Sequence, residues 1–141
     1  MAQAQNLPIY RRTSEFIIAY IKVYENMRNL HKYRMGAYIY DNLVRLPWFV
    51  KKANRYVDER RQTYIEDYLD ELENIGNALR VCHDTRMIDS RAHARLAEYV
   101  VELGKQANAW KRCRAGLSVG TPSDRDAVIK GCPVETREGT T

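Results

Sequence analysis

Apolar residues recur three and four positions apart in four long stretches of the chain, which predicts four amphipathic helices. We expect these helices over residues 14–30, 33–55, 59–83 and 90–113. In the first, the positions expected to face a core are Phe16, Ile17, Tyr20, Val23, Tyr24, Met27 and Leu30. In the second, they are Met35, Tyr38, Ile39, Leu43, Leu46, Phe49, Val50 and Ala53.

Local signals place the ends of these helices and one interruption. Thr13 or Ser14 is expected to cap the first helix, and Asp89 or Ser90 the fourth. Pro47 lies within the second helix, where a proline removes a backbone hydrogen bond. Because the apolar stripe continues across Pro47 without a change of phase, we predict one kinked helix rather than two.

The remaining segments lack helical periodicity. We expect residues 1–13 to form a loose N-terminal arm, and residues 116–141, rich in Gly, Pro, Ser and Thr, to form a flexible, disordered tail. Residues 14–115 then form a single all-α domain, an up-down antiparallel four-helix bundle with its second helix kinked at Pro47.

The chain carries no signal for a membrane or for secretion. No uninterrupted apolar stretch approaches the roughly 20 residues that span a bilayer. The first residues lack the basic region and apolar core of a secretory signal. We therefore expect a cytoplasmic protein with no membrane partner.

Charge is distributed unevenly along the chain. The formal net charge is +5, a moderate value that suits an anionic partner without establishing one. Between residues 32 and 55 the bases are opposed by a single acid, Asp41, whereas acids crowd residues 58–73. This asymmetry predicts one positive and one negative surface on the folded protein.

The basic residues are the candidates for binding an anionic partner. The chain has no glycine-and-aromatic recognition motif, so we expect any nucleic-acid contact to be with phosphates rather than bases. These bases could instead have structural roles only. They would then be solvated on the surface, form ion pairs along the fourth helix, or interact with the helix dipole near helix C-termini. The candidates are Arg34, Arg45, Lys51, Lys52, Arg55, Arg91, Arg95, Lys111, Arg112 and Arg114.

No catalytic or metal-binding pattern is recognisable. The chain has no glycine-rich phosphate loop, no His-Glu-x-x-His and no Glu-x-x-His pair of the kind that builds di-iron sites in bundles. Cys82, His83 and Asp84 adjoin in sequence, but consecutive helical positions point in different directions. We expect no enzymatic activity, no metal and no cofactor.

Three segments taken together carry a family resemblance. They are residues 33–47 with their mid-helix proline, residues 72–80, and residues 87–111, in which Gly104 precedes Trp110 and a basic residue. This combination resembles the accessory variability determinant (Avd) proteins of diversity-generating retroelements over about residues 14–114. It is also similar to their relatives, the four-helix-bundle proteins encoded within intervening sequences of ribosomal RNA genes. The asparagine expected after the proline in that second group is replaced here by Trp48-Phe49.

The resemblance to Avd implies a non-catalytic partner of a reverse transcriptase. Such proteins form a ring of five copies and bind both the polymerase and its template RNA. The complex makes the mutagenic, adenine-targeted cDNA that diversifies a target gene. The candidate bases would then contact the RNA phosphate backbone or the polymerase within a homopentamer.

Two alternatives remain. The first is a ribosomal-RNA intervening-sequence bundle protein of unknown role. A location of the gene inside a ribosomal RNA gene would favour this alternative, whereas an adjacent reverse transcriptase gene would favour an Avd protein. The second is a scaffold that binds other proteins through the acids of the third helix. The scaffold predicts that reversing the charges of Asp67, Asp70 and Glu71 abolishes function, while reversing the bases of the second helix does not.

Overall fold

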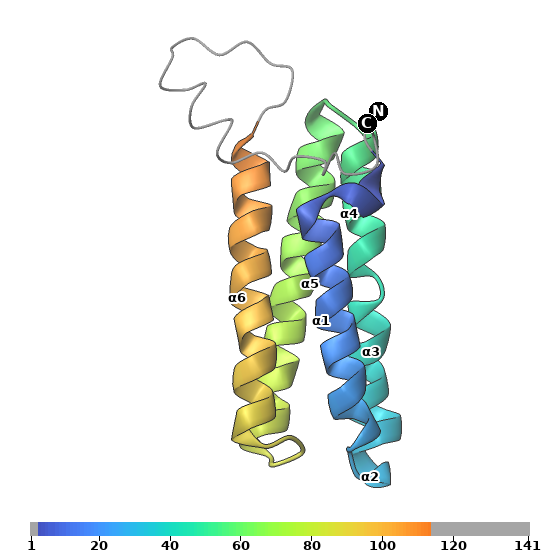
Figure 1. Cartoon of the computed structure of the whole chain (residues 1–141), viewed down its shortest axis with the longest axis vertical. Coiled ribbons are helices and arrows are strands. Elements are labelled where there is room, and N and C mark those ends of the chain that lie inside the picture. Colours follow the sequence, from blue (N-terminus) through green and yellow to red (C-terminus); the bar gives the residue numbers. More distant parts are fainter. Residues whose placement is uncertain (1–2, 114–141) are drawn as a thin grey trace.

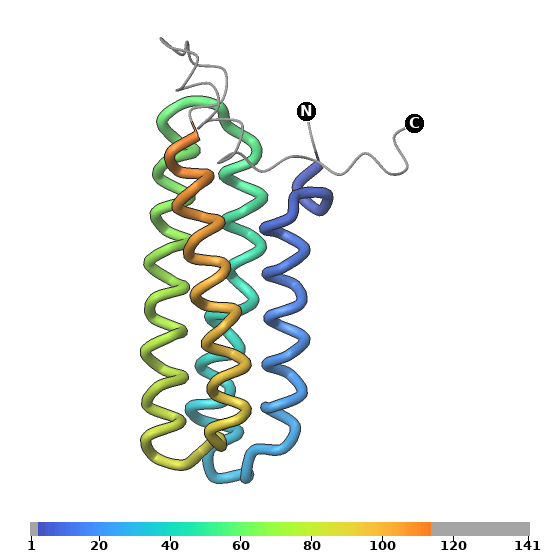
Figure 2. Tube along the Cα trace, turned by 60° about the vertical axis from the view of Figure 1, so that its left-hand side comes forward, coloured from blue at the N-terminus to red at the C-terminus, as the bar shows by residue number. Residues whose placement is uncertain are grey.

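The computed structural model describes residues 3–113, which form four helical columns packed side by side in alternating directions (Figures 1 and 2). The predicted all-α bundle is confirmed, and the described part contains no strand. The expected tail over residues 116–141 lies outside the described residues. The elements in chain order are η1 (Ala4–Asn6), α1 (Pro8–Glu25), α2 (Asn29–His31), the π-helical turn η2 (Lys32–Gly36), α3 (Ala37–Leu43), α4 (Leu46–Arg55), α5 (Glu59–Asp84) and α6 (Ser90–Arg112).

Helix α1 begins earlier than the sequence predicted. The expected loose arm over residues 1–13 is wrong from Pro8 onward, because proline is tolerated in the first turn of a helix, where its missing N–H has no intrahelical partner. Thr13 therefore lies inside the helix and caps nothing. The helix also ends early, at Glu25, so Leu30 is 67% exposed instead of facing the core.

The second column is interrupted beside Pro47, so the single kinked helix predicted there is divided into two helices. Helix α3 ends at Leu43 and α4 begins at Leu46, with a turn at Val44 and Arg45 between them. Pro47 has no N–H to donate to the carbonyl of Leu43, and its ring crowds that carbonyl. The amide of Arg45 instead donates to the carbonyl of Asn42 at 3.2 Å, which tightens the turn.

The π-helical turn η2 packs closely against the end of α1. A Cβ atom on Gly36 would lie 2.9 Å from the Met27 sulfur and 3.0 Å from the Tyr24 ring, so only glycine fits without a shift. The Tyr20 hydroxyl donates to the Gly36 carbonyl at 2.6 Å. This bond satisfies a buried acceptor of the irregular turn and joins the first column to the second.

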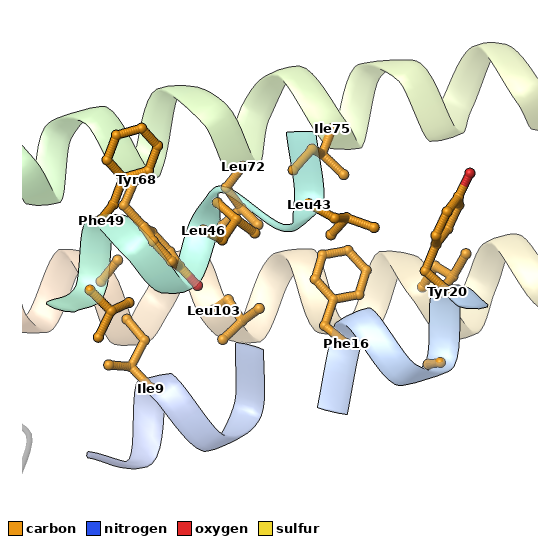
Figure 3. Close-up of a cluster of buried hydrophobic side chains, with 14 of the residues drawn as sticks. Ile9, Phe16, Tyr20, Leu43, Leu46, Phe49, Tyr68, Leu72, Ile75 and Leu103 are labelled. Atoms are coloured by element: carbon orange, nitrogen blue, oxygen red, sulfur yellow. The ribbon is translucent and has the colours of Figure 1, made fainter. Parts of the chain in front are cut away.

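The core lies along the axis between the columns (Figure 3). Phe16, Leu43 and Leu103 are fully buried there, each from a different column. Tyr38 departs from the predicted stripe: it is 48% exposed, and the Asn74 amide donates to its hydroxyl at 3.1 Å. The adjacent Ile39, predicted in the same stripe, is fully buried as expected.

A buried pair of hydroxyls links α1 to α5. The Thr13 hydroxyl donates its one proton to the Ile9 carbonyl at 2.6 Å, so the Tyr68 hydroxyl, 2.8 Å away, must donate to Thr13. Thr13→Val is expected to lower the free energy of unfolding by about 1–3 kcal/mol, because it leaves the Tyr68 donor buried without a partner. Tyr68→Phe should cost less, since Thr13 keeps its bond to Ile9.

Denaturant unfolding of Thr13→Val, Tyr68→Phe and the double variant measures this coupling. We expect the double variant to lose clearly less stability than the sum of the two single losses. Strict additivity would contradict the pairing of the two hydroxyls.

Two histidines stack where α5 turns into α6. The rings of His83 and His93 lie 4.5 Å apart and nearly parallel, and a ring nitrogen of His83 is 3.0 Å from the Ser90 hydroxyl. Burial lowers the pKa of His93 below its usual value, and nearby His83 and Arg80 lower it further, against an opposing effect of Asp84.

The lowered pKa of His93 makes stability fall in acid. The unfolded chain binds a proton at His93 more readily than the folded chain does, so the free energy of unfolding decreases as pH falls below about 6.5. His93→Gln should flatten this decrease, whereas the matched variant His31→Gln, outside the pair, should not. Thermal unfolding across pH 5–8 measures the difference, and identical pH profiles for His93→Gln and the unaltered protein would refute the assignment.

Candidate functional site

The candidate bases separate into groups at opposite ends of the bundle. One end, where α4 and α6 end and α5 begins, we term the α4–α5 end (Figure 1). It carries Lys51, Lys52, Arg55, Lys111 and Arg112. Arg34 in η2 and Arg91 and Arg95 at the start of α6 lie toward the other end, Arg45 lies at the interruption between α3 and α4, and Arg114 falls outside the described residues.

Helix α4 presents the clearest group of cations. It contains no acidic residue, and Lys51, Lys52 and Arg55 form no ion pair with any carboxylate of residues 3–113. All three lie in its last two turns, where positive charge is favoured by the helix dipole. Lys51 and Arg55 are exposed, so their charged groups are accessible to a large anionic partner.

Two other candidates already have acidic partners. The Lys111 ammonium lies 3.2 Å from a Glu66 carboxylate oxygen, and the Arg45 guanidinium lies 3.8 Å from Glu71. These carboxylates offset part of the positive charge of Lys111 and Arg45, which the sequence analysis had proposed as contacts for an anionic partner. Arg112, by contrast, is exposed and has no ion pair within the described part of the chain.

Arg61 follows the basic segment in sequence but serves the fold. Its side chain is 8% exposed, its Nε donates to the Ala53 carbonyl at 3.1 Å, and its guanidinium lies over the Trp110 ring. Burial lowers the pKa of Arg61. Because Ala53 is in the last turn of α4, this cation satisfies a terminal carbonyl and links α4, α5 and α6.

Three aromatic rings adjoin the cations of α4. Tyr56 stacks on Tyr64 with ring centroids 5.8 Å apart, and Trp48 meets Tyr64 edge-on at 6.1 Å. We term Trp48, Tyr56 and Tyr64 the aromatic strip. The ammonium of Lys52 lies 5.2 Å from the Trp48 ring, and the Arg60 guanidinium 4.0 Å from Tyr56. The sequence did not reveal this cluster, because its members come from α4, α5 and the connection between them.

At the opposite end, a groove of about 380 Å³ runs between α1 and α6. Arg91 and Arg95, one turn apart on α6, both line it, and Lys22 of α1 adds a third cation. The floor includes Val23, Met27, Met87 and Ile88. Lys22 was missed because no pattern within one helix shows which helix lies opposite. Arg34 is not part of this groove.

The described residues show no centre for metal chemistry. Within residues 3–113, no three His, Cys, Asp or Glu side chains converge to hold an ion. None of the helices in that range has both the length and the apolar character needed to cross a bilayer.

Comparison with protein-family models, curated proteins and solved structures finds no match to the chain.

Proposed function

We propose that this protein is a non-catalytic accessory subunit that binds a reverse transcriptase and its template RNA and supports mutagenic cDNA synthesis. The observation that carries the proposal is the group of cations on α4 without ion-pair partners among the described residues, at the end of the bundle where Arg112 also lies. The identity of the polymerase partner rests on the resemblance to Avd proteins.

The charge arrangement suits a polyanion bound through its backbone. Each phosphate that a lysine or arginine neutralises releases counterions, so binding is strong at low salt and weakly selective for sequence. In the proposed ring of five copies, equivalent α4–α5 ends repeat around the assembly and produce a larger positive field than one chain provides. Assembly thus turns a modest cluster into an extended RNA-binding surface.

Reconstituted reverse transcription tests the proposal. A candidate cognate reverse transcriptase, identified by a search of the neighbouring genes, is incubated with its template RNA, with and without the purified protein. We expect cDNA with substitutions at template adenines only when the protein is present. Equal yield and equal substitution in its absence would contradict the accessory role.

One observation favours a protein-binding scaffold as the second candidate. Asp67, Asp70 and Glu73 of α5 are exposed and form no ion pair within residues 3–113. Glu71, named with Asp67 and Asp70 from the sequence, is instead mostly buried beside Arg45. Reversing the exposed Asp67, Asp70 and Glu73 should abolish partner binding if α5 is the docking face. The same reversals should leave RNA binding intact if α4 carries the function.

A further inference from the structure

We propose that the aromatic strip stacks unpaired bases of single-stranded RNA while the cations of α4 hold the adjacent phosphates. This inference rests on the proposed function and adds to it, because the sequence alone predicted contacts with phosphates only. It assigns a preference for unpaired RNA to one surface of the α4–α5 end.

Trp48 exposes a large aromatic side chain on the surface of α4. Its side chain is 50% exposed, while Phe49, Val50 and Ala53 of the same helix fill the core. Contiguous exposed apolar patches, rather than single exposed residues, mark interaction sites, and Trp48 adjoins the half-buried rings of Tyr56 and Tyr64. The ring makes edge contacts with Phe49 and Tyr64, which hold its orientation.

The three rings form a contiguous cluster in which Trp48 is the most exposed. The parallel pair Tyr56–Tyr64 and the perpendicular Trp48 adjoin at 5.8 and 6.1 Å, so they present aromatic surface across the junction of α4 and α5. Aromatic side chains beside a basic groove are the usual device for holding single-stranded nucleic acid. Every base has a π-face, so such a surface works without reading sequence.

Charge favours nucleic acid over a protein partner at this surface. Lys51, Lys52 and Arg55 occupy the two turns of α4 that follow Trp48, and they have no acidic partner within the described residues. Asp58 is already held by Arg60, with 2.6 Å between oxygen and nitrogen.

On the α5 side the charge changes sign. Asp67 is exposed one turn after Tyr64 and repels phosphate. The RNA backbone therefore runs along α4, with its bases turned toward the strip.

The test compares Trp48→Ala, Trp48→Leu and Trp48→Phe in the full-length protein. Affinity is measured for a single-stranded RNA and for the duplex that it forms with its complement. Trp48→Ala and Trp48→Leu should bind the single strand about 5- to 100-fold more weakly, while Trp48→Phe keeps most of the affinity. Duplex binding should not change, because paired bases cannot reach the rings. Tyr33→Ala is the matched control, since Tyr33 is 69% exposed near the opposite end.

Tryptophan fluorescence of the full-length protein gives a second readout. Trp110 is buried, so quenching of the unaltered protein by single-stranded RNA should come from Trp48 and be absent in Trp48→Phe.

Three other outcomes would overturn either the stacking proposal or the proposed RNA function. Full single-strand affinity in Trp48→Ala, with loss in Lys51→Gln/Lys52→Gln/Arg55→Gln, overturns the stacking and leaves the proposed function standing. If Trp48→Ala changes the mass of the assembly but not its RNA affinity, the aromatic strip is an interface between copies, and the stacking proposal is overturned. No RNA binding by the unaltered protein removes the proposed RNA function itself.

Discussion

Phe16→Ala is expected to lower the free energy of unfolding by about 3–5 kcal/mol, measured by denaturant titration. The Phe16 ring is fully buried between the columns (Figure 3). It stacks on the Tyr99 ring with centroids 5.4 Å apart. Its removal costs both the transfer of the ring to water and the cavity that remains. Single domains are typically stable by about 5–15 kcal/mol, so the variant should be close to unfolding.

Ile18→Ala provides the matched control on the same helix. Ile18 is 55% exposed, and its loss should change stability by no more than about 0.5 kcal/mol. Equal losses for the two variants would mean that α1 does not pack its predicted face inward.

The triple variant Lys51→Gln/Lys52→Gln/Arg55→Gln is expected to bind single-stranded RNA about 100-fold more weakly at 0.1 M salt. The estimate takes three phosphate contacts, each releasing counterions. For the same reason the slope of log affinity against log salt should become shallower by about 2. Fluorescence anisotropy of labelled RNA across a range of salt concentrations measures both quantities.

A second triple variant removes the same charge from the opposite end. Lys22→Gln/Arg91→Gln/Arg95→Gln alters the groove between α1 and α6, far from α4 along the bundle. It should change RNA affinity and salt slope much less. Equal effects of both variants would mean that the whole net charge, rather than the α4–α5 end, attracts RNA.

The sequence predicted α5 and α6 nearly to the residue, for identifiable reasons. Both follow an aspartate that caps the helix: Asp58 accepts from the amide of Arg60 at 3.0 Å, and Asp89 from that of Ala92 at 2.7 Å. Their apolar stripes also run without interruption. The start of α1 was misplaced because a proline such as Pro8 is compatible with two structures. It breaks a helix from within, but it is favoured in the first turn of a helix, where Pro8 lies.

The candidate site was less predictable, because it depends on which helices meet. The neutralisation of Lys111 by Glu66 and the approach of Arg45 to Glu71 join residues from different columns. The same holds for Lys22 with Arg91 and Arg95, and for Trp48 with Tyr64. Helical periodicity identifies the inward face of each helix but not its neighbours, so groups of bases within one helix could be predicted and contacts between helices could not.

A salt titration of the unaltered full-length protein with single-stranded RNA tests the central claim most directly. If the cations of α4 hold phosphates, log affinity should fall linearly with log salt concentration, with a slope of about −2 or steeper. A flat response, or no binding at low salt, would contradict the account.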